Sequence, residues 1–113
     1  RQSEPVSKKD EIINRAKKYI SANTNCSVAD VARECHISEP YLYLLFKENV
    51  GCTPNDYRLK AKCQKGIEYL LTTDKTVEEI SALTCFSSAA HFRRILKSHM
   101  GLTPKEMRKK SDF

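Results

Sequence analysis

Hydrophobic residues recur every three or four positions along most of the chain, the spacing that lines up one face of an α-helix. Near the start, this spacing is followed by Ile12, Ile13, Ala16, Tyr19 and Ile20. No stretch alternates apolar and polar residues as a half-buried strand does. We therefore expect an all-α fold. The predicted helices span residues 8–23, 28–35, 39–50, 54–71, 77–84, 88–100 and 104–110.

Capping residues mark where four of these helices begin. A serine or threonine followed three residues later by an acidic residue can satisfy free backbone N–H groups at a helix start. Four such capping boxes are Ser27 with Asp30, Thr53 with Asp56, Thr76 with Glu79, and Thr103 with Glu106. Pro54 and Pro104 follow two of the caps at the first helical position, where the missing donor of proline costs nothing. Gly51 and Gly101 close the preceding helices.

The same pattern occurs twice along the chain. Residues 27–32 return with similar character at 76–81, and the Gly-x-Thr-Pro motif at 51–54 returns at 101–104. Each copy joins a short helix to a second helix through a tight turn, which is the helix-turn-helix unit. The predicted organisation is a polar leader or interdomain linker at 1–7, a first helix-turn-helix subdomain at 8–52, a linker helix at 53–72 and a second subdomain at 73–113.

Two groups of apolar residues are predicted to form the cores of these subdomains. The first group is Val31, Ala32, Cys35, Ile37, Leu42, Leu45 and Phe46. The second group is Ile80, Leu83, Phe86, Phe92, Ile95 and Leu96.

Charge favours a polyanionic partner. The chain has 20 basic and 14 acidic residues, a net charge of +6 and an isoelectric point near 9.1, so its surface is mixed and moderately basic. No apolar run reaches the roughly 18 residues of a membrane span, and no signal peptide opens the chain, so we expect no membrane partner and a cytoplasmic location. A start at Arg1 instead of methionine is expected of a piece of a longer protein.

No motif points to catalysis, a cofactor or a metal. A glycine-rich phosphate loop, a G-x-S-x-G elbow and an H-E-x-x-H helix are all missing from the sequence. The five cysteines include no C-x-x-C pair, which indicates reduced thiols and no zinc site. Cys35 and His36 are neighbours in a predicted turn and not in a preorganised site. We expect a protein that is not an enzyme.

An ordered set of motifs covers nearly the whole chain after Lys8. The motifs are Val31-Ala32 through Ser38, Tyr41-Leu42 through Phe46-Lys47, Gly51-x-Thr53-Pro54-x-x-Tyr57, Leu70-Leu71, Phe86-Ser87 through Phe92, and Gly101-x-Thr103-Pro104-x-Glu106-x-Arg108. The set resembles the double helix-turn-helix DNA-binding domain of the AraC/XylS family of bacterial transcription regulators. The resemblance implies sequence-specific binding of double-stranded DNA, with the second helix of each subdomain in successive major grooves and the linker helix between them.

The resemblance also implies which residues contact DNA. Base contacts are implied for Pro40, Tyr43 and Leu44 on one helix and for His91, Arg93 and Arg94 on the other. Phosphate contacts are implied for Lys47, Thr53, Lys97, Thr103, Lys105 and Arg108. Because arginine can hold guanine O6 and N7 with two hydrogen bonds, we expect the second helix to supply most of the sequence discrimination. The first helix is expected mainly to position the domain, with Leu44 able to pack on a thymine methyl group.

The chain departs from the family's usual residues in its second half. The family commonly has alanine, glycine and two polar residues at the positions of Ser81, Cys85, Ala89 and Ala90, and arginine and alanine at those of Lys62 and Gly66. We expect a strained second turn at Cys85. A glycine inside a helix costs about 0.5–1 kcal/mol relative to alanine, so Gly66 predicts a softer linker helix.

A second hypothesis is open at this stage. Tyr41, Tyr43 and Leu44 can instead form an apolar patch for a protein partner, in a helical interaction module with weak or lost DNA binding. Under the first hypothesis RNA polymerase is an expected partner, and sensing and oligomerisation belong to a region absent from this chain. Salt-sensitive binding to mixed-sequence DNA distinguishes the two hypotheses.

Overall fold

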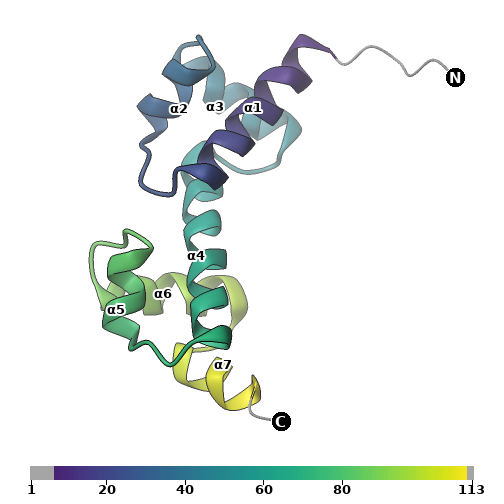
Figure 1. Ribbon diagram of the computed structural model, residues 1–113. Helices are drawn as coiled ribbons and strands as arrows, with labels where there is room; N and C mark the ends of the chain where they lie inside the picture. Colours follow the sequence, from purple (N-terminus) through teal and green to yellow (C-terminus); the bar gives the residue numbers. More distant parts are fainter. Residues whose placement is uncertain (1–6, 112–113) are drawn as a thin grey trace, which may run out of the picture. The chain divides into compact units, whose positions relative to one another are not determined.

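Residues 7–111, the part of the chain that the computed structural model describes, form seven α-helices and no strand (Figure 1). The helices are α1 (Lys8–Ala22), α2 (Val28–Glu34), α3 (Glu39–Asn49), α4 (Pro54–Thr72), α5 (Val77–Leu83), α6 (Ala89–Met100) and α7 (Pro104–Ser111). The predicted all-α fold is confirmed, and each helix lies within one residue of its predicted bounds. Of the predicted leader, residues 1–6 lie outside the described part, and Ser7 is the N-cap of α1.

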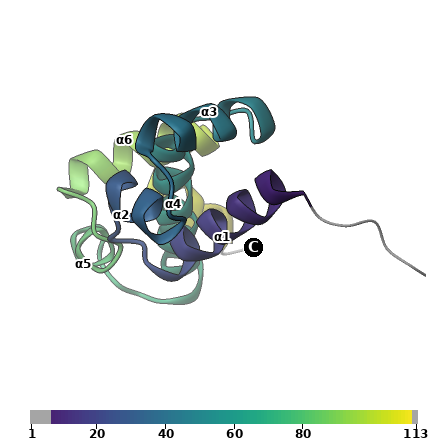
Figure 2. The same ribbon diagram turned by 90° about the horizontal axis from the view of Figure 1, so that it is seen from above.

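The chain divides into two compact units, a first unit at Arg1–Arg58 and a second at Leu59–Phe113, with the boundary inside α4. In the first unit α1 contacts both α2 and α3, which also contact each other (Figure 2). The buried residues on these three helices are Ile13, Ala16, Ile20, Val31, Ala32, Leu42, Leu45 and Phe46. The fully buried Phe46 also meets the ring of Tyr57 edge-on, with 5.8 Å between centroids. Burial of each large apolar side chain stabilises the unit by about 1.5–3 kcal/mol.

The second unit has its own core, to which α4, α5, α6 and α7 all contribute (Figure 1). Its buried members are Cys63, Ile67, Leu70, Ile80, Phe86, Phe92, Leu96 and Met107. The prediction that Leu83 belongs to this core is wrong, because its side chain is 50% exposed. Its neighbour Thr84 is buried instead, and the Thr84 hydroxyl donates to the carbonyl of Ile80 (2.7 Å). The hydrogen bond satisfies a polar group that would otherwise be costly to bury.

Capping boxes form at three of the four predicted helix starts. Ser27, Thr76 and Thr103 each accept the backbone N–H three residues on, and the acidic residue there accepts the cap's own N–H. At Thr53 the structure has only the forward bond, from the Asp56 N–H to Oγ1 (3.0 Å). Hydrogen bonds from the backbone hold the pKa of each of the three bonded carboxyls below its usual value. These carboxyls belong to Asp30, Glu79 and Glu106.

Both helix-turn-helix turns place a residue other than glycine in the left-handed region. The φ angle is 58° at His36 and 64° at Cys85, and these residues hold equivalent positions in the repeat. Each turn is closed by the same backbone hydrogen bond, from Ile37 N–H to Ala32 O (3.1 Å) and from Phe86 N–H to Ser81 O (2.9 Å). The left-handed conformation costs a residue with a Cβ roughly 1–2 kcal/mol. The strain predicted at Cys85 is therefore present, and His36 carries it too.

Candidate nucleic-acid interface

Helix α6 carries a cationic outer face. Its N-cap is Ser88, whose hydroxyl accepts the backbone N–H of His91 (3.1 Å). Phe92 and Leu96 are buried on the inner side, so the helical period leaves Arg93, Arg94 and Lys97 exposed on the outside. The face thus offers three positive charges on a rigid element, which suits contact with a polyanion.

The two arginines of this face differ in what they contact. Arg93 Nη2 lies 3.4 Å from Glu78 Oε2, and both side chains are exposed. An exposed ion pair of this kind is worth about 0–1 kcal/mol and exchanges readily for another anion. Within residues 7–111, the exposed side chain of Arg94 makes no hydrogen bond and no ion pair. The Arg94 donors are therefore available to a ligand without breaking an existing contact.

The pKa of His91, at the start of α6, lies below its usual value, which favours the neutral imidazole. Partial burial lowers its pKa, and the positive charges of Arg94 and Lys62 lower it further. Its ring lies edge-on to Phe86, with 5.3 Å between centroids, and Nδ1 is 3.3 Å from the Ser87 hydroxyl. A neutral imidazole offers one donor and one acceptor, so His91 can contact a base edge without adding charge.

Helix α3 presents a different outer face. Tyr43 is 38% exposed and Leu44 is 50% exposed, while Pro40 lies exposed in the first turn. The helix carries one lysine, Lys47, against two glutamates, a net charge of −1, whereas α6 carries two arginines and one lysine, a net charge of +3. The outer face of α3 is thus largely apolar, on a helix that is slightly acidic, and it offers fewer hydrogen-bond donors than the face of α6.

Two of the residues expected to contact phosphate, Lys97 at the end of α6 and Thr103 before α7, both contact Glu106. Lys97 Nζ donates to the carbonyl of Gly101 (3.1 Å) and lies 3.8 Å from Glu106 Oε1. Glu106 also accepts the backbone N–H of Thr103 (2.8 Å). A phosphate at this position would have to replace the Glu106 carboxylate. Lys105, Lys47 and Thr53 lie outside this cluster, the two lysines exposed and Thr53 partly buried.

Arg108 has a structural contact that the sequence did not reveal. Its Nε donates to the carbonyl of Leu70 (3.0 Å) and its Nη2 to the carbonyl of Thr73 (2.8 Å). The last carbonyls of a helix lack partners within the helix and carry its negative dipole end, which a guanidinium stabilises. Arg108 therefore ties α7 to the end of α4. No local pattern in the sequence predicts this bond, because the two segments lie more than 30 residues apart.

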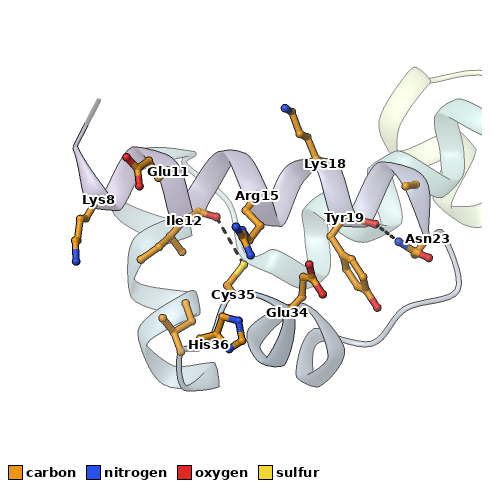
Figure 3. Close-up of a pocket in the computed structure, with 12 residues that line it drawn as sticks. Lys8, Glu11, Ile12, Arg15, Lys18, Tyr19, Asn23, Glu34, Cys35 and His36 are labelled. Atoms are coloured by element: carbon orange, nitrogen blue, oxygen red, sulfur yellow. Dashed lines mark hydrogen bonds between the residues drawn. The ribbon is translucent and has the colours of Figure 1, made fainter. Parts of the chain in front are cut away.

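A groove of about 840 Å³ lies in the first unit between α1 and the end of α2 (Figure 3). Figure 3 shows Arg15 of α1 on one side of it and Glu34, Cys35 and His36 on the other. The Cys35 thiol lies 3.7 Å from the carbonyl of Ile12, and burial raises its pKa. A buried, protonated thiol is a poor nucleophile, so the groove has no activated cysteine.

Two properties of the described residues bear on other classes of site. Within residues 7–111, His, Cys, Asp and Glu side chains nowhere gather in a group of three or more that could hold a metal ion. In the same range, each helix is too short or too polar to cross a membrane.

Comparison with known proteins identifies the class of this fold and of its outer helices. Residues 31–110 match a family described as "Helix-turn-helix domain". The fold is similar to the crystal structure of a transcriptional regulator from Chromobacterium violaceum, which is titled as an AraC-type DNA-binding domain-containing protein. The two structures align with a TM-score of 0.83 and 30% sequence identity, over 89% of this chain and 92% of that one. The Msm operon regulatory protein of Streptococcus mutans is 30% identical over 100 residues, 86% of this chain and 36% of that protein. The probable transcription factor PqrA of Proteus vulgaris is 27% identical over 99 residues, 88% of this chain and 81% of that protein.

The chain is a DNA-binding module of a transcription regulator, and its relatives are bacterial. It belongs to the AraC-type helix-turn-helix family. The predicted family and the predicted function in transcription regulation are confirmed. Because the family and the relatives are transcription regulators, the prediction that the protein is not an enzyme is confirmed too. The alternative of a protein-interaction module is not favoured. The chain spans 36% to 38% of the length of three of its curated relatives.

Proposed function

We propose that the chain reads double-stranded DNA with α3 and α6, each placed in the major groove, and that the two helices use different chemistry. Successive grooves on one face of B-DNA are about 34 Å apart, the spacing that tandem helix-turn-helix units read. The observation that carries the proposal is the cationic outer face of α6, on which Arg94 has available donors. Most of the sequence discrimination is assigned to this helix.

On α6, Arg94 is the main base-reading residue. Its guanidinium can bond guanine O6 and N7 together, and such a pair is worth about 1–3 kcal/mol of discrimination against a wrong base. Arg93 reads a base or phosphate after leaving Glu78, and neutral His91 reads a base edge. On α3, Leu44 and Tyr43 pack on thymine methyl groups, with Pro40 alongside at the start of the helix.

Phosphate contacts set affinity and register. We assign them to cations and helix starts near the two outer helices, and a phosphate displaces Glu106 where it approaches α7. The contacting residues are Lys47, Thr53, Lys97, Thr103 and Lys105. Arg108, expected from the sequence to contact phosphate, is assigned to the end of α4 instead because two of its donors are used there.

The larger protein supplies what this module lacks. Its relatives extend well beyond the matched region, so we assign sensing and oligomerisation to a region outside this chain. RNA polymerase is the proposed second partner, and the cytoplasm is the proposed location because the DNA and polymerase of a bacterium lie there.

Alanine variants of the two helices test the division of labour. Competition binding measures the affinity for a specific and a scrambled duplex at fixed salt. Arg94→Ala is expected to reduce the ratio of the two affinities by about tenfold to 100-fold, and Tyr43→Ala by less. Arg33→Ala is the matched control, because it removes the same charge from an exposed, ion-paired arginine to which no DNA contact is assigned. A larger loss from Tyr43→Ala than from Arg94→Ala contradicts the proposal.

A further inference from the structure

Gly66 lies inside α4 because α6 packs against it. A Cβ at this position would come within 2.5 Å and 2.7 Å of two ring carbons of Phe92. Ordinary contacts of a Cβ begin at 3.4 Å, so an alanine would require a movement of about 0.9 Å, the difference between 3.4 and 2.5. Phe92 is fully buried, so its ring has no empty space to enter, and the helix that carries it would have to move. The sequence prediction of a softer α4 misses this role.

The repeat contains a matched pair in the first unit. Tyr19-Ile20 and Phe46-Lys47 correspond to Tyr69-Leu70 and Leu96-Lys97 at an offset of 50, which aligns Ala16 with Gly66 and Leu42 with Phe92. Ala16 and Leu42 are both fully buried, on helices that contact each other. The larger ring on α6 is thus matched by the loss of one methyl group on α4. At these two equivalent positions the first unit has the pair Ala16 and Leu42, and the second unit has the pair Gly66 and Phe92.

A second contact ties α4 to the turn that precedes α6. Lys62 is buried, at 7% exposure, and its Nζ donates to the carbonyl of Cys85 (2.8 Å). The same Nζ lies 5.5 Å from the centre of the Phe86 ring, a cation–π contact. Cys85 is the left-handed residue of the turn, so this bond supports the turn at its most strained point. Lys62 and Gly66 lie one helical turn apart on α4 and contact the two ends of one segment, residues 85–92.

We propose that Gly66 and Lys62 are positioning residues that set the depth and rotation at which α6 sits on α4, and so determine which bases its outer face reaches. The inference rests on the proposed DNA contacts of α6. Neither residue is itself assigned a contact with DNA. A base-edge hydrogen bond tolerates only a few tenths of an ångström, so a shift of the size that an alanine at 66 requires would disturb it. Phosphate contacts, which depend mainly on charge, would change little.

Gly66→Ala and the double variant Gly66→Ala/Phe92→Leu test this inference. The double variant rebuilds in the second unit the Ala16–Leu42 pair of the first. Discrimination is the affinity for a selected duplex divided by the affinity for a duplex with a single base change. The α6 ratio refers to base changes in the half-site assigned to α6, and the α3 ratio to base changes in the half-site assigned to α3. Gly66→Ala is expected to reduce the α6 ratio by about tenfold. The α3 ratio and the slope of log affinity against log salt should stay unchanged, and the double variant should recover most of the α6 ratio.

Thermal unfolding gives a readout that does not involve DNA. Replacing a glycine inside a helix by alanine normally raises Tm. The packing of Phe92 predicts the opposite here, a lowered Tm that Phe92→Leu partly restores in the double variant. Should Gly66→Ala unfold the second unit, the double variant still reports whether the two positions are coupled.

The outcomes separate this inference from the proposed function. A raised Tm together with unchanged discrimination in Gly66→Ala overturns the inference and leaves the proposed function intact. An equal loss at both half-sites also overturns it, because the shift would then not be confined to α6. If the unaltered protein binds selected and scrambled duplexes equally, the proposed function itself fails.

Discussion

The two helix-turn-helix units share their internal design and differ on their outer helices. Both have a capping box at the start of the short helix, a left-handed residue in the turn and the same closing hydrogen bond. In contrast, α6 presents arginines and a net charge of +3, and α3 presents Tyr43 and Leu44 and a net charge of −1. The repeated features belong to the fold, and the residues that differ are those to which we assign the reading of DNA.

The supporting helices differ as well. The last turn of α1 is capped by the residue that follows the helix, since the side-chain amide of Asn23 donates to the carbonyl of Tyr19 (3.0 Å). The end of α4 is closed from α7 by Arg108. The second unit makes the equivalent local bond, from the Thr73 hydroxyl to the carbonyl of Tyr69 (2.6 Å), and adds the long-range contact from Arg108. Variants of single residues can separate the local contact from the long-range one.

The largest expected effect is on the cores that the units share. Phe46→Ala and Phe92→Ala should each lower the free energy of unfolding by about 3–5 kcal/mol, because both rings are fully buried. Urea unfolding followed by circular dichroism measures the loss. Leu44→Ala is the matched control, as half of its surface is exposed, and should change stability by no more than about 0.5 kcal/mol. If Phe92→Ala left the free energy of unfolding unchanged, Phe92 would not belong to the core of the second unit.

Arg108→Ala should destabilise the second unit by about 1.5–3 kcal/mol, the usual worth of hydrogen bonds from a charged group. The neighbouring Lys109→Ala removes the same charge from an exposed position and should have little effect. Urea unfolding of both variants makes the comparison. Salt slopes of DNA binding add a second test, since the loss of a phosphate contact in Arg108→Ala would reduce the magnitude of the slope by about one unit. A reduced slope with unchanged stability would return Arg108 to the phosphate-contacting set.

Leu44→Arg transfers the chemistry of α6 to α3, because residue 44 corresponds to residue 94 in the repeat. We expect tighter binding by about tenfold at low salt, a salt slope steeper by about one unit, and a new preference for guanine in the α3 half-site. Fluorescence anisotropy over a range of salt concentrations measures the first two. Leu44→Gln, which adds hydrogen bonding without charge, is the control. If Leu44→Arg gains nothing, α3 does not lie against DNA.

Glycine at the strained turn positions should stabilise both units. His36→Gly and Cys85→Gly each remove the steric cost of a left-handed residue but add the entropic cost of ordering a glycine. The free energy of unfolding should therefore rise by about 0.5–1 kcal/mol. Thermal unfolding measures the gain. The control Ala82→Gly, in the helix before the turn, should lose a similar amount. A destabilised Cys85→Gly would show that the Cys85 side chain contributes more than its backbone strain costs.

The smallest effect concerns His91, whose equivalent position on α3 is Tyr41. Its folded-state pKa lies below the usual 6.5, through burial first and then the charges of Arg94 and Lys62. As pH falls, the unfolded chain takes up this proton first, so the contribution to stability is complete above about pH 6.5 and is lost as pH drops through the folded pKa. NMR titration of the imidazole should give a pKa below 6.5 that rises in Lys62→Met. An unchanged value would place Lys62 too far away to matter.

Local signals made most of the fold predictable. The helical spacing of Ile13, Ala16 and Ile20 and the cap at Ser27 depend only on neighbours within a few residues, and the structure reproduces both. The repeat revealed the two turns for the same reason. Leu83 was misassigned because periodicity cannot tell which of two adjacent residues at a helix end enters the core, and here the hydroxyl of Thr84 finds a partner inside.

Long-range contacts were not predictable. The bond from Arg108 to Leu70, the packing of Phe92 on Gly66 and the bond from Lys62 to Cys85 each join segments more than 20 residues apart. From the sequence, Arg108 is one more cation in a basic helix, and Gly66 is only a weak helix former. The outer helices could be located from the repeat, while the residues that hold α6 in place became visible only in three dimensions.

Selection of bound duplexes from a random pool tests the central claim most directly, with the unaltered protein and Arg94→Ala compared. The account predicts a bipartite site for the unaltered protein, with a guanine in the half assigned to α6 and thymines in the half assigned to α3. Arg94→Ala should lose the guanine and keep the thymines. Recovery of the same site by both proteins, or of no preferred site by either, would contradict it.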